Sequence, residues 1–138
     1  MNTIKKTMTT AILLTVALGV TAPAFADYVT DGIIIRRVAP TATCGVSGMF
    51  TDPANLDRGR ADNLSVNCVP GVSRKSDYVN YLNGLAAGNY CVADAKRVVQ
   101  KGGRIRKDAI TRPPANPYHC LLDGISAKDL ANIVTPNP

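Results

Sequence analysis

His119 is the residue of this sequence best suited to proton transfer near neutral pH. It is the only histidine in the 138-residue chain, and it lies between Tyr118 and Cys120. Histidine is the side-chain type that ordinarily changes its charge near neutrality. A metal-independent ribonuclease needs a base for the ribose 2′-hydroxyl, an acid for the leaving oxygen and cations for the transition state. The alternative interpretation is a structural histidine beside a disulfide, hydrogen-bonded to the backbone.

A strongly basic segment ends seven residues before His119. Between positions 96 and 112 the net charge is +6 over 17 residues. This equals the formal net charge of the whole chain, so the positive charge is concentrated in this segment. A single arginine guanidinium can form two hydrogen bonds with one phosphate or sulfate group, so the segment predicts an anion-binding surface. A solvated basic face is the alternative. The cationic residues of the segment are Lys96, Arg97, Lys101, Arg104, Arg106, Lys107 and Arg112.

The nuclease hypothesis combines this segment with the histidine. His119 would transfer the proton, and Arg104, Arg106 or Lys107 would stabilise the phosphate, with Tyr118 or Asp108 assisting. The two arginines are two positions apart, so in a strand they would share one face. No aromatic residue lies between positions 96 and 112, so no base-stacking platform is predicted there.

Composition and motifs exclude several other kinds of site. All ten acidic residues are Asp, and there is neither a Glu nor a second His, which excludes most two-His and two-Glu catalytic sites. The Asp- and Asn-rich stretch 51–63 lacks the register of an EF-hand calcium loop. Met49 stands where the last glycine of a G-x-S-x-G elbow belongs. No phosphate-binding or dinucleotide-binding loop is found, so neither a cofactor nor a metal is expected.

Four cysteines predict two disulfides. They are Cys44, Cys68, Cys91 and Cys120, and an even count in a small exported domain is typical of a disulfide framework. Structural zinc sites usually bring their ligands in close pairs such as C-x-x-C, and this chain has no such pair. Three connectivities remain open. If neighbouring cysteines pair along the chain, each disulfide contributes about 3 kcal/mol through loop entropy.

Residues 1–26 are predicted to be a cleaved secretory signal peptide of bacterial type. Lys5 and Lys6 precede an uncharged apolar run over positions 11–20, and the run is followed by Ala24-Phe25-Ala26. This run is about half the ~20 residues that span a bilayer, and no later run exceeds it, so no membrane span is expected in the mature chain. The mature chain would comprise 112 residues from Asp27 with net charge +4, in the periplasm or outside the cell.

The mature residues 27–138 predict one domain with strands and helices. Strands are expected at 28–38, with a buried Ile33–Ile35 run, and at 64–69, 104–110 and 118–122. Helices are expected at 76–88 and 89–101, the second capped by Asn89. Residues 39–50 should be irregular and residues 51–63 a polar loop. Aromatic residues form only 5% of the chain, so the core should be mainly aliphatic.

The C-terminal helix has the clearest local signature. Ser126 and Asp129 form a variant of the capping box, and Ile125 and Leu130 form a hydrophobic staple. The fold class predicted is therefore α+β: a single small disulfide-stabilised domain with a small antiparallel or mixed sheet, two central helices and a short C-terminal helix.

Three functions fit these features. The first is an exported binding protein that uses residues 96–112 on an anionic macromolecule, which would be an acidic protein, an envelope polymer or a nucleic acid. The second is a secreted metal-independent ribonuclease that uses His119. The third is a subunit of a secreted or surface assembly, in which the Ile33–Ile35 strand or the C-terminal helix contacts neighbours. The absence of Glu and of a second His in the sequence favours the first, and the oligomeric state stays open.

Overall fold

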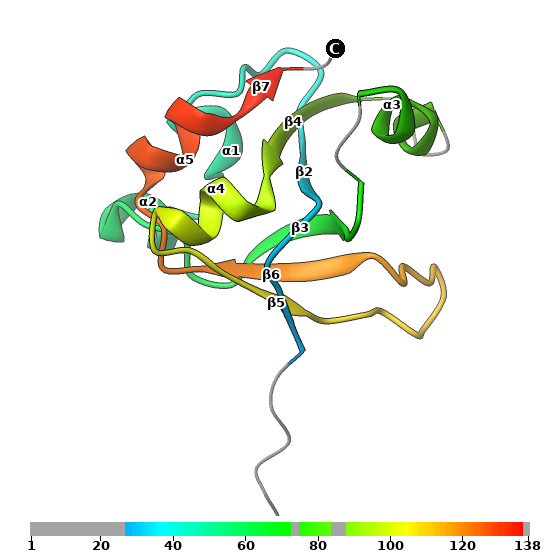
Figure 1. The fold of residues 1–138 in the computed structure, drawn as a ribbon. Coiled ribbons are helices and arrows are strands. Elements are labelled where there is room, and N and C mark those ends of the chain that lie inside the picture. Colours follow the sequence, from blue (N-terminus) through cyan, green and yellow to red (C-terminus); the bar gives the residue numbers. More distant parts are fainter. Residues whose placement is uncertain (1–26, 73–74, 84–87, 137–138) are drawn as a thin grey trace, which may run out of the picture.

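The computed structural model describes residues 27–72, 75–83 and 88–136, which form a small α+β domain built on one antiparallel sheet (Figure 1). The strand order is β1-β5-β6-β3-β2-β4-β7. The strands are β1 (Tyr28–Val29), β2 (Ile33–Val38), β3 (Leu64–Val69), β4 (Asn89–Asp94), β5 (Arg104–Lys107), β6 (His119–Asp123) and β7 (Thr135–Pro136). The helices are α1 (Val46–Met49), α2 (Pro53–Arg58), α3 (Lys75–Asn83), α4 (Ala95–Gln100) and α5 (Ala127–Ile133).

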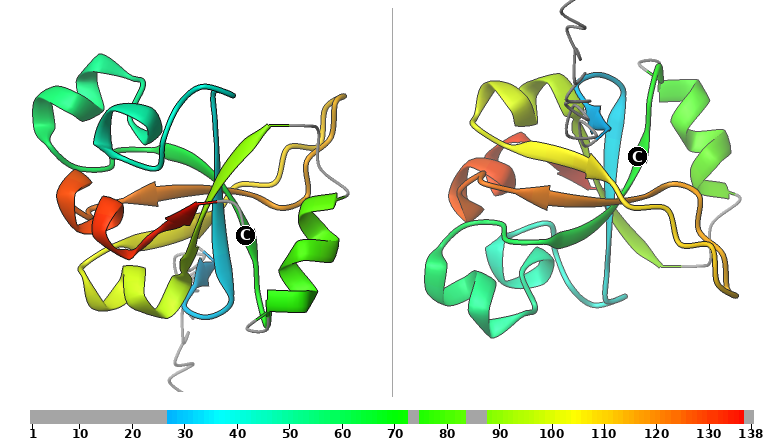
Figure 2. Two further views of the ribbon diagram at one scale, coloured as in Figure 1. Left: turned by 90° about the horizontal axis from the view of Figure 1, so that it is seen from above. Right: turned by 90° about the horizontal axis from the view of Figure 1, so that it is seen from below.

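The main core lies between one face of the sheet and the helices α1, α4 and α5. Helices α1, α2, α4 and α5 gather on this side, while α3 lies apart from them across the sheet (Figures 1 and 2). Every second side chain of a strand points into this core, where it packs against side chains of the helices. Its fully buried side chains include Phe50, Ile105, Cys120, Leu122, Ile125 and Leu130.

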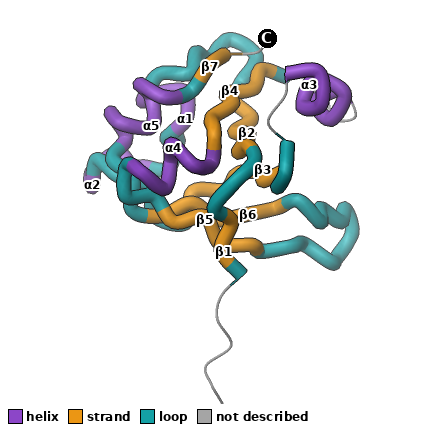
Figure 3. The backbone as a smooth tube through the Cα atoms, in the orientation of Figure 1, coloured by secondary structure: helices purple, strands orange, loops and turns teal. Residues whose placement is uncertain are grey.

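Helix α3 covers only part of the other face. Tyr78 and Leu82, one helical turn apart, pack with Ile33, Ile35 and Val92 of strands β2 and β4 in a second, smaller apolar cluster. In Figure 3, no helix among the described residues lies on the lower side of β1, β5 and β6. The side chains that β5 and β6 direct away from the main core are therefore left without a helical cover, whereas Val69 of β3 packs in the same small cluster as α3.

Both predicted disulfides form. Cys44 pairs with Cys91, and Cys68 pairs with Cys120. Each pair skips one cysteine, so the loops are longer than pairing along the chain would give: the sequence separations are 47 and 52 residues. None of the four cysteines is free.

Several predicted elements are confirmed. Strand β3 occupies 64–69 as expected, and Ile33, Ile34 and Ile35 in β2 are buried on both faces. Strands β5 and β6 lie at the strands predicted for 104–110 and 118–122, and they pair antiparallel. Helix α5 begins at the predicted cap: the hydroxyl of Ser126 accepts a hydrogen bond from the Asp129 backbone N–H at 3.0 Å.

The helix predicted at 89–101 is wrong in its first half. Residues 89–94 form strand β4, which pairs with all six residues of β2, and the helix begins only after the N-cap Asp94. The apolar spacing fits a helix locally, but the pairing with β2 and the disulfide at Cys91 hold this segment extended. Tertiary pairing here overrides the local pattern.

Residues 39–63 contain two short helices where irregular structure was expected. Helix α2 has the Asp52 side chain as its cap, which accepts a hydrogen bond from the Ala54 N–H at 2.9 Å, and Pro53 occupies its first turn. This signature was present in the sequence and was overlooked. Residues 135–136, where no strand was predicted, pair with β4 as the edge strand β7.

The predicted signal peptide lies outside the described residues, as does part of the predicted helix at 76–88. Among the helices that the structure describes, none has the length and apolar character needed to cross a membrane.

Candidate functional site

The side chains that the sequence predicted for chemistry meet on the face of β5, β6 and β3 that points away from the main core. Register decides this, because residues directly opposite in an antiparallel pair share a face. Arg106 and Ser65 both lie opposite Leu121, and His119 lies opposite Asn67. We call this surface the open face. It consists of Ser65, Asn67, Arg104, Arg106, Asp108, His119, Leu121 and Asp123.

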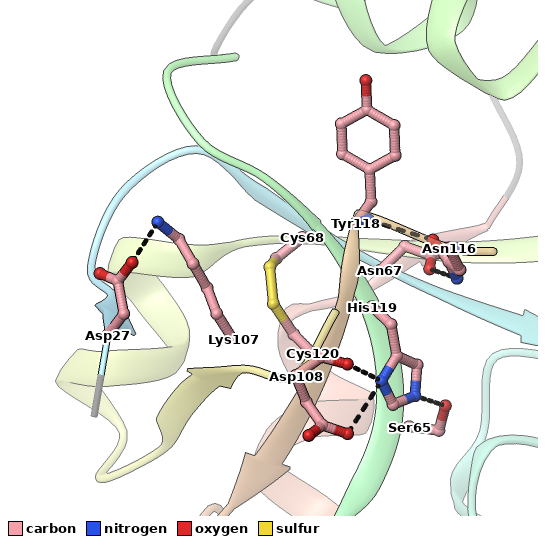
Figure 4. The surroundings of a disulfide bond; sticks show 10 residues. All are labelled: Asp27, Ser65, Asn67, Cys68, Lys107, Asp108, Asn116, Tyr118, His119 and Cys120. Atoms are coloured by element: carbon pink, nitrogen blue, oxygen red, sulfur yellow. Dashed lines mark hydrogen bonds and ion pairs between the residues drawn. A yellow bond between two sulfur atoms is a disulfide. The ribbon is translucent and has the colours of Figure 1, made fainter. Parts of the chain in front are cut away.

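His119 is held at both ring nitrogens. Its Nε2 lies 2.7 Å from the Ser65 Oγ, and its Nδ1 lies 2.9 Å from the Asp108 backbone oxygen and 3.2 Å from the Asp108 Oδ2 (Figure 4). The His119 side chain is only 12% exposed, whereas that of Asp108 is 45% exposed and Ser65 is an exposed residue. We refer to these three residues as the Ser65–His119–Asp108 chain.

The Cys68–Cys120 disulfide lies directly behind this chain. Cys120 follows His119 on β6 and is fully buried in the main core, while Cys68 lies on β3, one residue beyond Asn67. The disulfide thus joins, on the core side, the two strands that carry Ser65 and His119 on the open face (Figure 4). A covalent link next to the paired residues limits sliding of the two strands.

Arg104 and Arg106 lie on the open face as the two-residue spacing predicts. The Arg106 side chain extends across β6 towards the start of β3, where its Nη2 lies 3.5 Å from the Asn63 Oδ1. Arg104 is exposed and lies opposite Asp123. Tyr28, which is 51% exposed, lies opposite Arg106 on β1 and adds an aromatic ring to this edge.

The other cations of the basic segment lie elsewhere. Lys96 and Arg97 belong to α4 on the helical side of the sheet, and Lys101 follows α4, with its Nζ 3.9 Å from the Asp129 Oδ1. Lys107 alternates to the opposite side of β5 from Arg106 and pairs with Asp27 at 2.8 Å. Arg112 lies exposed in the β5–β6 connection. The structure therefore divides the predicted surface and leaves two of its seven cations, Arg104 and Arg106, in the strand that borders His119.

A cleft of about 860 Å³ lies beside the open face, between α3 and the β5–β6 connection. Tyr81, Tyr90 and Tyr118 line it, and the rings of Tyr81 and Tyr118 meet edge to face with centroids 5.0 Å apart. Asn67 joins the cleft to the open face: it lies opposite His119, and its Oδ1 accepts a hydrogen bond from the Asn116 Nδ2 at 2.8 Å. The Tyr118 ring points away from His119 (Figure 4).

Replacing Tyr81 with Phe should leave stability unchanged or raise it by up to about 1 kcal/mol, because the buried Tyr81 hydroxyl has no hydrogen-bond partner among the described residues. Burial, reinforced by Tyr118 and Tyr90, raises the pKa of Tyr81 to about 12 from its ordinary value of 10.0. The neutral phenol is thus favoured in the folded state. Its contribution to stability is complete below pH 10 and is lost as the pH rises towards 12.

Urea unfolding between pH 7 and 12 measures both effects. The Tyr81→Phe variant should lose less stability than the native protein between pH 10 and 12. A Tyr81→Phe variant that is destabilised by more than about 1 kcal/mol at pH 7 would mean that the hydroxyl is hydrogen-bonded.

Comparison with known proteins does not place the chain in a family. It matches no protein-family model, no curated protein and no solved structure. Its function therefore has to be inferred from the geometry of the open face.

Sequence reasoning identified His119, Arg104 and Arg106 but assigned no role to Ser65. The signal that could have found it is the alternation of Ser65 and Asn67 with apolar residues, which places both on one face of a strand. What the sequence lacks is the pairing of β3 with β6, which places Ser65 at the histidine. Within the described ranges, no group of three or more His, Cys or Asp side chains is arranged to hold a metal ion.

Proposed function

We propose that the protein binds an anionic macromolecule on the open face, with Arg104 and Arg106 as the main anion contacts. The observation that carries this proposal is the placement of both arginines on the same face as His119, on β5, which no described helix covers on that side. Two guanidinium groups on adjacent same-face positions of a strand can each form bidentate hydrogen bonds with phosphate, sulfate or carboxylate groups. The exposed Tyr28 can stack on the rings of a polymer at the same edge.

We also propose that the protein is exported through a bacterial-type secretory signal and acts in the periplasm or outside the cell. The two disulfides support an oxidising compartment, where such bonds form and persist. The charge and apolar pattern of residues 1–26 supports cleavage after Ala26.

Two double variants with equal loss of charge test the binding proposal. Arg104→Ala/Arg106→Ala changes the open face, and Lys96→Ala/Arg97→Ala changes α4 on the other side of the sheet. Heparin and a single-stranded RNA serve as probes. The affinity of the open-face variant for each should be at least about tenfold lower than that of the native protein, because charged hydrogen bonds are lost. For the RNA, the slope of log affinity against log salt should also fall by about 1.4 for two lost phosphate contacts.

The α4 variant is the control for net charge. It should keep most of the native affinity, since Lys96 and Arg97 lie outside the open face. Equal losses in both variants would mean that binding follows net charge and not the open face.

The ribonuclease hypothesis keeps one specific support, the position of His119 on the same face as Arg104 and Arg106. Cleavage of RNA requires a second group for proton transfer. Two predicted helpers are directed elsewhere: Lys107 pairs with Asp27, and the Tyr118 ring packs on Tyr81. The ribonuclease is therefore the second candidate.

The two segments named in the assembly hypothesis contact other parts of this chain, so they give that hypothesis less support. Ile33, Ile34 and Ile35 are at most 6% exposed, and they lie between β3 and β4 of this chain. The apolar face of α5, which includes Leu130 and Ile133, is packed into the main core.

A further inference from the structure

The Ser65–His119–Asp108 chain has the order of groups that activates a serine hydroxyl. A nucleophile needs a base within hydrogen-bond reach, and the base needs a third group that orients it. Here the Ser65 Oγ is 2.7 Å from the His119 Nε2, and Asp108 holds the Nδ1 with two oxygens at 2.9 and 3.2 Å.

The Asp108 backbone oxygen decides which ring nitrogen carries the proton in neutral His119. A carbonyl oxygen can only accept a hydrogen bond, so the Nδ1 must donate to it. The lone pair is then on the Nε2, and the short contact with Ser65 requires the serine hydroxyl to donate. In this arrangement His119 is ready to take the Ser65 proton.

Exposure and rigidity fit the same assignment. Ser65 is exposed and can meet a substrate, while the His119 side chain is shielded from water. Both residues stand on paired strands, and the Arg36 Nη1 donates to the Ser65 carbonyl oxygen at 2.7 Å. Reactive groups on paired strands hold their geometry better than groups on loops.

We propose that Ser65, His119 and Asp108 form a hydrolytic site for carboxylic esters. Ser65 is the nucleophile, His119 is the base and acid, and Asp108 is a positioning residue. The chain needs only one histidine for this chemistry, because the same ring acts as base and then as acid. The expectation that the natural ester carries anionic groups rests on the proposed function, whereas the reaction itself does not.

The reaction has two halves. The Ser65 oxygen bonds to the ester carbonyl carbon, its proton passes to the His119 Nε2, and the carbonyl π electrons move to the oxygen. When the carbonyl re-forms, the bond to the alcohol oxygen breaks and that oxygen takes the proton from the Nε2. Water then attacks the acyl-Ser65 carbonyl in the same way. The acid is released, and Ser65 recovers its proton.

Arg106 is the group placed to stabilise the oxyanion. Its guanidinium crosses β6 and reaches Asn63, two residues before Ser65. Fixed donors directed at developing negative charge commonly make a large contribution to catalysis. Arg106 would therefore serve both anion binding and the reaction, so Ser65 and not Arg106 is the residue to change in the test.

The test is labelling of the full oxidised protein with a fluorophosphonate probe, followed by peptide mass spectrometry, together with turnover of p-nitrophenyl acetate. Both probes are uncharged, so they do not depend on anion binding. We expect a label on Ser65 that Ser65→Ala abolishes and that His119→Gln reduces at least tenfold. Ser76→Ala, which removes an exposed serine on α3, is the matched control and should leave labelling and turnover unchanged.

Asp108→Asn separates positioning from a purely structural role. It should lower kcat on the order of 10²-fold while KM stays close to the native value, because the amide no longer stabilises the charged ring. Circular dichroism of each variant confirms that it is folded.

Three results would overturn the proposal: no labelling of native protein, labelling independent of Ser65, or RNA cleavage in EDTA that persists in Ser65→Ala and is lost in His119→Gln. The third result would establish the ribonuclease instead. Loss of heparin binding in Arg104→Ala/Arg106→Ala leaves the hydrolytic proposal intact. Failure of Ser65 labelling leaves the binding proposal intact, so the two can fail separately.

Discussion

Replacement of Cys68 and Cys120 by Ala is expected to lower the free energy of unfolding by about 4 kcal/mol, for a loop that spans 52 residues. The physical reason is that the cross-link restricts the unfolded chain, and the restriction grows with the logarithm of loop length. The Cys44–Cys91 loop spans 47 residues and should contribute a similar amount. Small domains have a net stability of about 5–15 kcal/mol, so loss of both disulfides should unfold the protein.

The two disulfides should differ in their effect on the open face. Cys68–Cys120 joins the strands that carry Ser65 and His119, whereas Cys44–Cys91 joins the segment before α1 to β4. At a low temperature where both variants are folded, heparin binding should weaken in Cys68→Ala/Cys120→Ala and stay near native in Cys44→Ala/Cys91→Ala. Urea unfolding and binding isotherms measure this. An unfolding free energy that is unchanged in either variant would contradict the expected role of the disulfides.

Phe50→Ala should be the most costly single substitution in the main core, at about 3–5 kcal/mol. Phe50 is fully buried at the end of α1, and its N–H donates to the Val46 oxygen at 3.0 Å. The Arg36 Nε donates to the Met49 oxygen at 3.1 Å and ties this turn to β2, so the helix end cannot move in to fill the cavity.

Phe50→Leu is the control, because it keeps an apolar side chain of intermediate size. It should cost about 1–2 kcal/mol in urea unfolding at constant m-value. A loss below 1 kcal/mol for Phe50→Ala would show that Phe50 does not anchor the core.

Local signals predicted some elements well. Strand β3 is bounded by turn residues, and α5 has both a capping pair and a hydrophobic staple; each signal lies within a few residues of the element that it defines. The burial of Ile33–Ile35 follows from an uninterrupted β-branched run at the centre of a sheet.

Long-range contacts explain why the helix predicted at 89–101 is wrong in its first half. Cys91, Val92 and Ala95 have a spacing that suits a helix face, yet Cys91 and Val92 lie in a strand. The partners that hold them there, β2 and Cys44, are more than 45 residues away in sequence. A short apolar run does not by itself distinguish a buried strand from a helix.

In the candidate site too, some features follow from local sequence patterns and others depend on long-range contacts. The shared face of Arg104 and Arg106 follows from the two-residue period of a strand. The contact between Ser65 and His119 requires the β3–β6 pairing, over a separation of 54 residues that no local pattern encodes. The basic segment also divides at the boundary of α4 and β5, because a helix and a strand in sequence place their side chains on different layers.

An amide-resolved NMR titration decides most directly whether the open face binds anions. The oxidised protein, labelled with nitrogen-15, is titrated with a heparin-derived hexasaccharide at low and at high salt. Binding as proposed would give the largest shifts at Arg104, Arg106 and their neighbours on β6 and β3, and high salt would abolish them. Shifts confined to α4 around Lys96 and Arg97, or no saturable shifts at low salt, would contradict it.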